Sequence, residues 1–187
     1  MAGLLDRAIA TLAACNDPAC RRGRDLAAIL LALMVVLAVA QILSRALLDY
    51  TLDWAEELAR MALVWSVLLV APIAYRGGSH VAIGSFADAL PRRLLLLVSL
   101  ALNLLVVWIC VMLLAESAGF WRRGLTIVSS TMGFRLAWVY AIVPVALLAL
   151  VLVGIELLLR LVRALGGASR DELVLAGAVP IVQRDLG

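Results

Sequence analysis

Four charged side chains and the only histidine of the chain occupy one stretch, and their types and spacing could support chemistry. Glu56, Glu57 and Arg60 lie three and four positions apart, so a helix would place them on one face. Arg76 and His80 follow after a long uncharged run and enclose a Gly-Gly pair. Carboxylates and a guanidinium at this spacing form ion pairs, whereas acid–base catalysis needs such groups around a common cavity.

The rest of the sequence shows no cluster of titratable, nucleophilic or metal-binding residues. A haem site with two axial histidines is excluded, because His80 is the single histidine. Cys15, Cys20 and Cys110 form no CxxC pair and are interpreted as free thiols. Cys15 and Cys20 could form a disulfide only in an oxidising compartment. We therefore expect a protein that is not an enzyme and that holds no cofactor and no metal ion.

The composition indicates an integral membrane protein of one domain. Of its 187 residues 65% are hydrophobic, and the mean hydropathy is +1.09, whereas a soluble domain is nearer half apolar. All 16 basic residues are arginine, and most of them flank the apolar runs. The net charge of +3 is therefore interpreted as a membrane-topology signal, not as a sign of nucleic-acid binding.

The charged residues must be positioned by apolar helices, because four runs are long enough, or nearly so, to cross a bilayer. The predicted spans are residues 26–43, 58–75, 94–115 and 136–155. Between the second and the third, apolar residues spaced three and four apart within residues 81–90 predict a short amphipathic helix on the membrane surface. The expected fold is therefore all-α, with four transmembrane helices plus this interfacial helix.

The membrane domain is expected to cover residues 26–163, between two tails. In the N-terminal tail, residues 1–25, a short surface helix and disorder are both compatible with the sequence. Residues 164–187 form the C-terminal tail. The two tails and the connection after the second span hold eleven arginines, against five on the other side. Since the arginine-rich side faces the cytoplasm, both termini are expected there.

The second span is expected to begin with Asp53 as its N-cap, and Glu56 would complete a capping box. Arg60 must then either snorkel or pair with the glutamates, and pairing is favoured because the partners are one turn away. Trp54 and Trp65 are expected to be interfacial anchors. A heptad seam follows the same helix through Trp54, Leu58, Met61, Trp65, Leu68 and Pro72. Packing within the bundle is favoured for this seam over contact with another subunit.

Three further polar or special positions lie in the later spans. Asn103, in the middle of the third span, is expected to bond across to another helix or to backbone. Pro144 removes one backbone hydrogen bond and is expected to bend the fourth helix. Glu156 and Arg160, four residues apart, are interpreted as a solvated ion pair at the membrane interface.

The combination of motifs resembles the small membrane subunit of tripartite ATP-independent periplasmic (TRAP) transporters, the DctQ type. It consists of Arg45, Tyr50, the WAEELAR segment from Trp54 to Arg60, Trp65, and the RGGSHV segment from Arg76 to Val81. The Leu90-Pro91-Arg92 sequence and the pattern of Trp138, Tyr140 and Pro144 are also similar to that family. The resemblance covers residues 26–163.

This resemblance implies a subunit of the bacterial inner membrane that is bound beside a much larger, multi-span subunit of the DctM type. In that family the large subunit holds the substrate and sodium sites and moves like an elevator. A periplasmic solute-binding protein delivers the substrate, often a carboxylate such as a dicarboxylate, keto acid or sialic acid. Uptake uses an ion gradient, and the small subunit enlarges the static scaffold and helps to dock the binding protein. Membrane lipid is the remaining expected partner.

Two assignments stay open for the charged residues. Glu56, Glu57 and Arg60 form either an outer-interface cluster that fixes the second helix and contacts a partner, or a simple helix cap. Arg76 and His80 form either a headgroup or partner contact at the inner face, or a polar turn. The alternative function is a self-contained, oligomeric tetraspan channel or transporter. An accessory subunit is favoured because the span centres offer little polar chemistry beyond Asn103.

Overall fold

The computed structural model describes residues 2–77, 92–129 and 131–165, which contain five helices and no β-strand. The helices are Ala2–Leu48 (α1), Asp53–Arg76 (α2), Arg92–Gly124 (α4), Ala137–Tyr140 (α5) and Ile142–Leu165 (α6). Four helical segments are long and apolar enough to cross a membrane: Asp6–Leu47, Asp53–Arg76, Leu96–Gly124 and Ala137–Arg163. The all-α fold with four transmembrane helices is thus confirmed. The interfacial helix expected within residues 81–90 lies outside the described residues.

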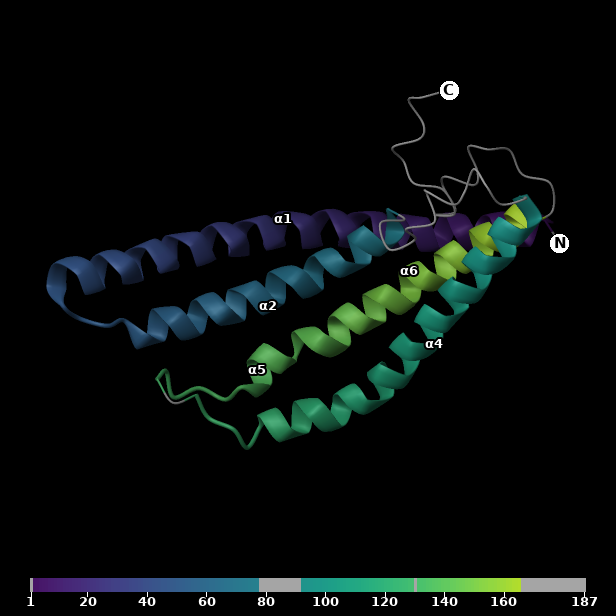
Figure 1. The fold of residues 1–187 in the computed structure, drawn as a ribbon. Helices are drawn as coiled ribbons and strands as arrows, with labels where there is room; N and C mark the ends of the chain where they lie inside the picture. Colours follow the sequence, from purple (N-terminus) through teal and green to yellow (C-terminus); the bar gives the residue numbers. More distant parts are fainter. Residues whose placement is uncertain (1, 78–91, 130, 166–187) are drawn as a thin grey trace, which may run out of the picture.

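The helices form a bundle in which α2 and α6 lie between α1 and α4 (Figure 1). α1 packs along α2, α4 packs along α6, and α1 also contacts α6. The chain starts near the last turn of α6, and the last residue of α2, Arg76, lies beside Asp17 further along α1. We call this region the N-terminal end of the bundle. The connections α1–α2 and α4–α5 lie at the opposite end, which we call the hairpin end. Large apolar side chains of both outer helices stay exposed, among them Val36 (63%) and Leu104 (59%).

α1 is a single helix of 47 residues, about 70 Å long, whereas a bilayer core is about 30 Å thick. It continues through Pro18, so the residues expected as an N-terminal tail extend the first span without a break. The division of the chain into tails and a membrane domain stays a prediction.

One face of α1 is packed from Asn16 to Ser44. Its buried and half-buried residues recur four and three apart: Asn16, Cys20, Gly23, Ala27, Leu30, Met34, Leu37, Gln41 and Ser44. The two backbones approach closely here, because a Cβ atom at Gly23 would lie 3.2 Å from the carbonyl oxygen of Leu69 in α2. This heptad spacing packs the second half of α1 along α2, whereas Asn16 on the same face contacts α6.

The predicted start of α2 is wrong in its details. Leu52 is the N-cap residue and makes no side-chain cap bond, and the helix begins at Asp53. The connection from α1 is only four residues long, and Asp49 turns the chain with a φ of 50°. This tight turn places Asp53 one position too late to cap, so the capping box with Glu56 does not form. Both acidic residues still lie in the first turn, at the positive end of the helix dipole.

The fourth span is divided at Ala141 into α5 and α6. Pro144 lies three residues after this position and has no amide hydrogen for the carbonyl of Tyr140, which a regular helix would pair with it. The interruption therefore falls within one turn before the proline, where the sequence predicts a bend.

Candidate functional site

Glu156 is the centre of a charged network inside the N-terminal end of the bundle. Its side chain is 0% exposed. It accepts hydrogen bonds from Asn16 Nδ2 at 2.7 Å, from Arg76 at 2.9 Å, and from Arg160. The expectation of a solvated Glu156–Arg160 pair is therefore wrong. The first half of α1, which was expected to be a tail, covers the carboxylate and excludes water from it.

Arg76 links three helices in this network. Its guanidinium donates to Asp17 of α1 and to Glu156 of α6. Two carboxylates and two guanidiniums take part, so the network (Asn16, Asp17, Arg76, Glu156 and Arg160) is neutral when all four are ionised. A buried charge that is both paired and hydrogen-bonded in this way is stable, whereas an unpaired one is costly. No motif in the sequence marks Asn16 or Asp17, although the four- and three-residue spacing of α1 extends upstream as far as Asn16.

A second polar contact lies next to the network, between α2 and α4. Tyr75 Oη donates to the side-chain oxygen of Asn103, and both residues are buried. The prediction that Asn103 bonds across to another helix is thus confirmed. The Tyr75 ring packs against Val153 and Leu157 of α6, so one tyrosine joins three helices.

At the hairpin end, Glu56 and Glu57 hold two different neighbours of α2. Glu56 accepts from Arg60 at 2.8 Å, which is the predicted pairing, and from Gln41 of α1 at 3.4 Å. Glu57 accepts from the hydroxyl of Ser129 at 2.7 Å and from that of Thr131, both in the loop before α5. We call these residues the hairpin-end cluster. The two adjacent carboxylates therefore fix α2 to α1 on one side and to the α4–α5 loop on the other.

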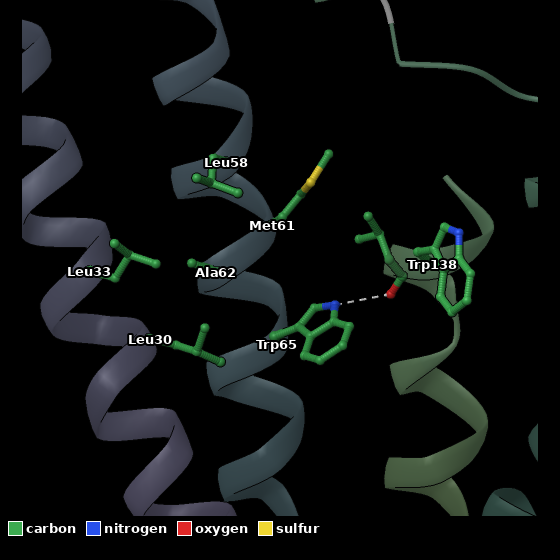
Figure 2. A pocket seen from close by; sticks show the side chains of 8 residues that line it. Leu30, Leu33, Leu58, Met61, Ala62, Trp65 and Trp138 are labelled. Carbon is green, nitrogen blue, oxygen red and sulfur yellow. Dashed lines mark hydrogen bonds between the residues drawn. The ribbon is translucent and has the colours of Figure 1, made fainter. Parts of the chain in front are cut away.

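An apolar groove of about 270 Å³ lies between α1, α2 and the start of the fourth span. Figure 2 shows its lining, which consists of Leu30, Leu33, Leu58, Met61, Ala62, Trp65, Trp138 and Val139. The Trp65 indole donates to the carbonyl oxygen of Val139 at 3.2 Å. Apart from the indoles of Trp65 and Trp138 the lining side chains carry no nitrogen or oxygen atom, so the groove is mainly apolar and presents no charged group. Part of the predicted α2 seam (Leu58, Met61 and Trp65) thus lies within the bundle.

The remaining sequence-predicted residues lie apart from these contacts. Arg45 is exposed in the last turn of α1, and Trp54 is 43% exposed at the start of α2. Pro144 is in the first turn of α6. His80 lies outside the described residues. Among the residues that the structure describes, no three His, Cys, Asp or Glu side chains are grouped so that they could hold a metal ion.

Two comparisons with known proteins agree with one another. Residues 34–164 match the family model described as tripartite ATP-independent periplasmic transporters, DctQ component. The chain is also 31% identical over 142 residues to the sialic acid TRAP transporter small permease protein SiaQ of Vibrio cholerae. That alignment covers 75% of this chain and 81% of the relative. The family match includes α2, α4, α5 and most of α6, but it begins after Asn16 and Asp17.

Proposed function

The chain belongs to the DctQ component family of the TRAP transporters, and from this premise we propose that it is the static scaffold of a solute-uptake complex. As a small permease subunit it is a transporter component of the inner membrane and not an enzyme. Its proposed partners are a large DctM-type membrane subunit, which carries out transport, and a periplasmic solute-binding protein. The proposed cargo is a carboxylate, and the proposed driving force is an ion gradient.

The observation that carries this proposal is that the buried polar side chains of the described bundle bond to one another. Glu156, Arg76 and Asn103 are each engaged by other side chains of the same chain. A transporter that recognises its own solute needs polar groups that are free to exchange partners near the membrane centre. Polar side chains that are paired within the chain instead favour a subunit that keeps its conformation while the neighbouring large subunit moves.

The outer surface supports the same role. The apolar faces of α1 and α4 are largely exposed in the single chain, including Val36, Val39, Leu102 and Leu105. In a membrane such faces contact lipid or another helix. We propose that the large subunit covers part of this surface and that lipid covers the rest.

The excess of arginine at the N-terminal end supports a cytoplasmic location for both termini. The hairpin-end cluster would then lie at the periplasmic face. There it would hold the α1–α2 and α4–α5 connections in fixed positions, where a binding protein could dock. Arg76 would lie near the cytoplasmic face and act within the chain, as the bridge between α1 and α6.

Reconstitution tests the scaffold proposal directly. The chain, the large subunit and both together are placed in separate liposomes, and uptake of sialic acid or succinate is measured with the solute-loaded binding protein and a sodium gradient. We expect uptake only with both subunits, and co-purification of the chain with the large subunit. Solute movement by the chain alone would overturn the scaffold role and support a self-contained transporter.

A further inference from the structure

We propose that the axis of the bundle is inclined to the membrane normal. Residues of α1 and α4 at the same height along the bundle axis then lie at different depths in the membrane. This inference uses only the contacts between helices and the uncharged run of each helix. It is independent of what the protein transports.

Hydrogen bonds define one level near the N-terminal end. Asn16 of α1 and Arg76 of α2 both donate to Glu156 of α6. Tyr75, the residue before Arg76, donates to Asn103 of α4. All four helices are therefore at the same height in the bundle at these residues.

The same level falls at very different places in the four uncharged runs. The run of α1 begins at Leu26, ten residues or about 15 Å further along the helix than Asn16. The runs of α2 and α6 end at this level, with Tyr75 and Ile155. The run of α4 extends from Leu94 to Ala115, so Asn103 is close to its midpoint. Since an uncharged run belongs in the hydrocarbon, α1 is outside the membrane where α4 is at its centre.

At a second level, further toward the hairpin end, α4 instead of α1 lies outside its uncharged run. Leu30 lines the groove together with Trp65 of α2, whose indole donates to Val139. The next residue, Tyr140, stacks on Phe120 of α4 with ring centroids 4.4 Å apart. At this level α1 is inside its uncharged run. α4 has already passed the end of its run, because Phe120 comes after Glu116.

The two levels together exclude a simple displacement of an upright bundle along the membrane normal. Such a displacement would shift all four helices by the same amount. It would leave unchanged the offset between the two helices, in which α4 is further along its uncharged run than α1 at both levels. An inclined bundle brings the staggered runs to a common depth, since tilting is how helices adapt to a bilayer. α1 and α4 lie on opposite sides of α2 and α6 (Figure 1), so inclination separates them most in depth.

The exposed charges of α1 support this arrangement. Gly23 lies against Leu69, six residues inside the uncharged run of α2. Arg24 and Asp25 follow at once, with side chains 66% and 70% exposed. In an upright bundle these charges would face hydrocarbon at the depth of Leu69, which is strongly unfavourable. Inclination of the bundle instead places the segment of α1 that carries Arg24 and Asp25 in the headgroup region.

Spin labels at four positions test the inclination in the full-length chain in lipid nanodiscs. The first pair is native Cys15 and Leu104→Cys, which flank the bonded residues of the first level and are both exposed. The second pair is Leu31→Cys and Gly119→Cys at the second level, where a Cβ atom on Gly119 would meet nothing within 4 Å. The other native cysteines are changed to alanine in each variant. Accessibility to oxygen and to a nickel chelate reports depth.

We expect the nickel-to-oxygen accessibility ratio to be several-fold higher at Cys15 than at Leu104→Cys. At the second level the order should reverse, with the higher ratio at Gly119→Cys and the lower ratio at Leu31→Cys. Equal ratios within both pairs, or the same order in both pairs, would overturn the proposal. Leu105→Cys, also exposed (48%), repeats the α4 measurement if Leu104→Cys does not fold, and helix content by circular dichroism identifies such a variant.

Discussion

Two glutamates of this chain have the same local sequence relation to an arginine but opposite surroundings. Glu56 and Glu156 each pair with an arginine four residues later. The side chains of the first pair are 57% and 73% exposed, whereas Glu156 is 0% exposed. Spacing alone therefore predicts that both pairs form, but it does not predict which of them matters for stability.

The substitutions Glu156→Gln and Glu56→Gln should separate these two situations. Loss of the charge at Glu156 leaves Arg76 and Arg160 without their shared carboxylate, and breaking a buried pair costs about 3–5 kcal/mol. An exposed pair at four-residue spacing contributes only about 0.3–0.5 kcal/mol. We expect a much lower thermal midpoint in detergent for Glu156→Gln and a small shift for Glu56→Gln. Similar midpoints for the two variants would show that water reaches Glu156.

The Tyr75–Asn103 bond can be measured with a double-mutant cycle of Tyr75→Phe and Asn103→Ala. Hydrogen bonds between membrane helices contribute about 0.6 kcal/mol on average and up to about 1.7 kcal/mol. We expect a coupling energy in this range, because both side chains are buried and bonded to each other. Unfolding free energies of the two single variants and the double variant in mixed micelles provide the measurement. Additive effects would mean that the bond contributes nothing.

Of the candidate site, the sequence predicts the local contacts and misses most of the distant ones. The Arg60–Glu56 pair joins residues within one turn, and helix periodicity is sufficient to predict it. The contact of Glu156 with Asn16 joins residues 140 positions apart. It depends on how α1 crosses α6, which no local pattern encodes. Asn103 is an intermediate case, since its depth predicts that it has a partner but not that the partner is Tyr75.

At the scale of the helices, glycines decide how closely neighbours approach. Gly124 ends α4 against α5, and a Cβ atom there would lie 2.9 Å from Ala137 Cα and 2.6 Å from the Tyr140 ring. Gly119 is five residues earlier in the same helix, and a Cβ atom there meets nothing within 4 Å. These two positions therefore form a matched pair.

Gly124→Ala should destabilise the protein, and Gly119→Ala should not. Overpacking against backbone atoms costs about 1–3 kcal/mol, whereas alanine in an open helical position gains up to about 1 kcal/mol over glycine. We expect thermal midpoints in detergent to shift in opposite directions. If both variants were stabilised, α4 and α5 would be able to separate at little cost.

The helices themselves were predictable where apolar runs are long, and less so where they are not. All four expected spans exist as helices, because the bilayer length constraint is strong. The unbroken extension of α1 into residues 2–25 was not predicted, because Asp17, Pro18 and three nearby arginines interrupt the apolar pattern. The start of α2 was misplaced by one residue, which is within the usual uncertainty of a helix boundary.

At the scale of the whole molecule, α1 has two roles. Its second half is an apolar span at the edge of the bundle, and its first half covers the charged ends of α2 and α6. Asp6 extends this cover with a 2.7 Å ion pair to Arg163, in which both side chains are about half exposed. The contacts of the first half thus differ in burial, and truncation can separate them.

Two N-terminal deletions should therefore differ strongly in stability. Deletion of residues 2–13 removes the Asp6–Arg163 pair, and exposed pairs contribute only about 0–1 kcal/mol. Deletion of residues 2–18 also removes Asn16 and Asp17, so it uncovers Glu156 and Arg76 while it keeps the arginines before the first span. We expect a thermal midpoint close to that of the full chain for the shorter deletion and a much lower one for the longer. Because the uncovered carboxylate admits water, Glu156→Gln should add little destabilisation in the longer deletion. A full additional effect of Glu156→Gln there would mean that α1 is not what keeps this carboxylate dry.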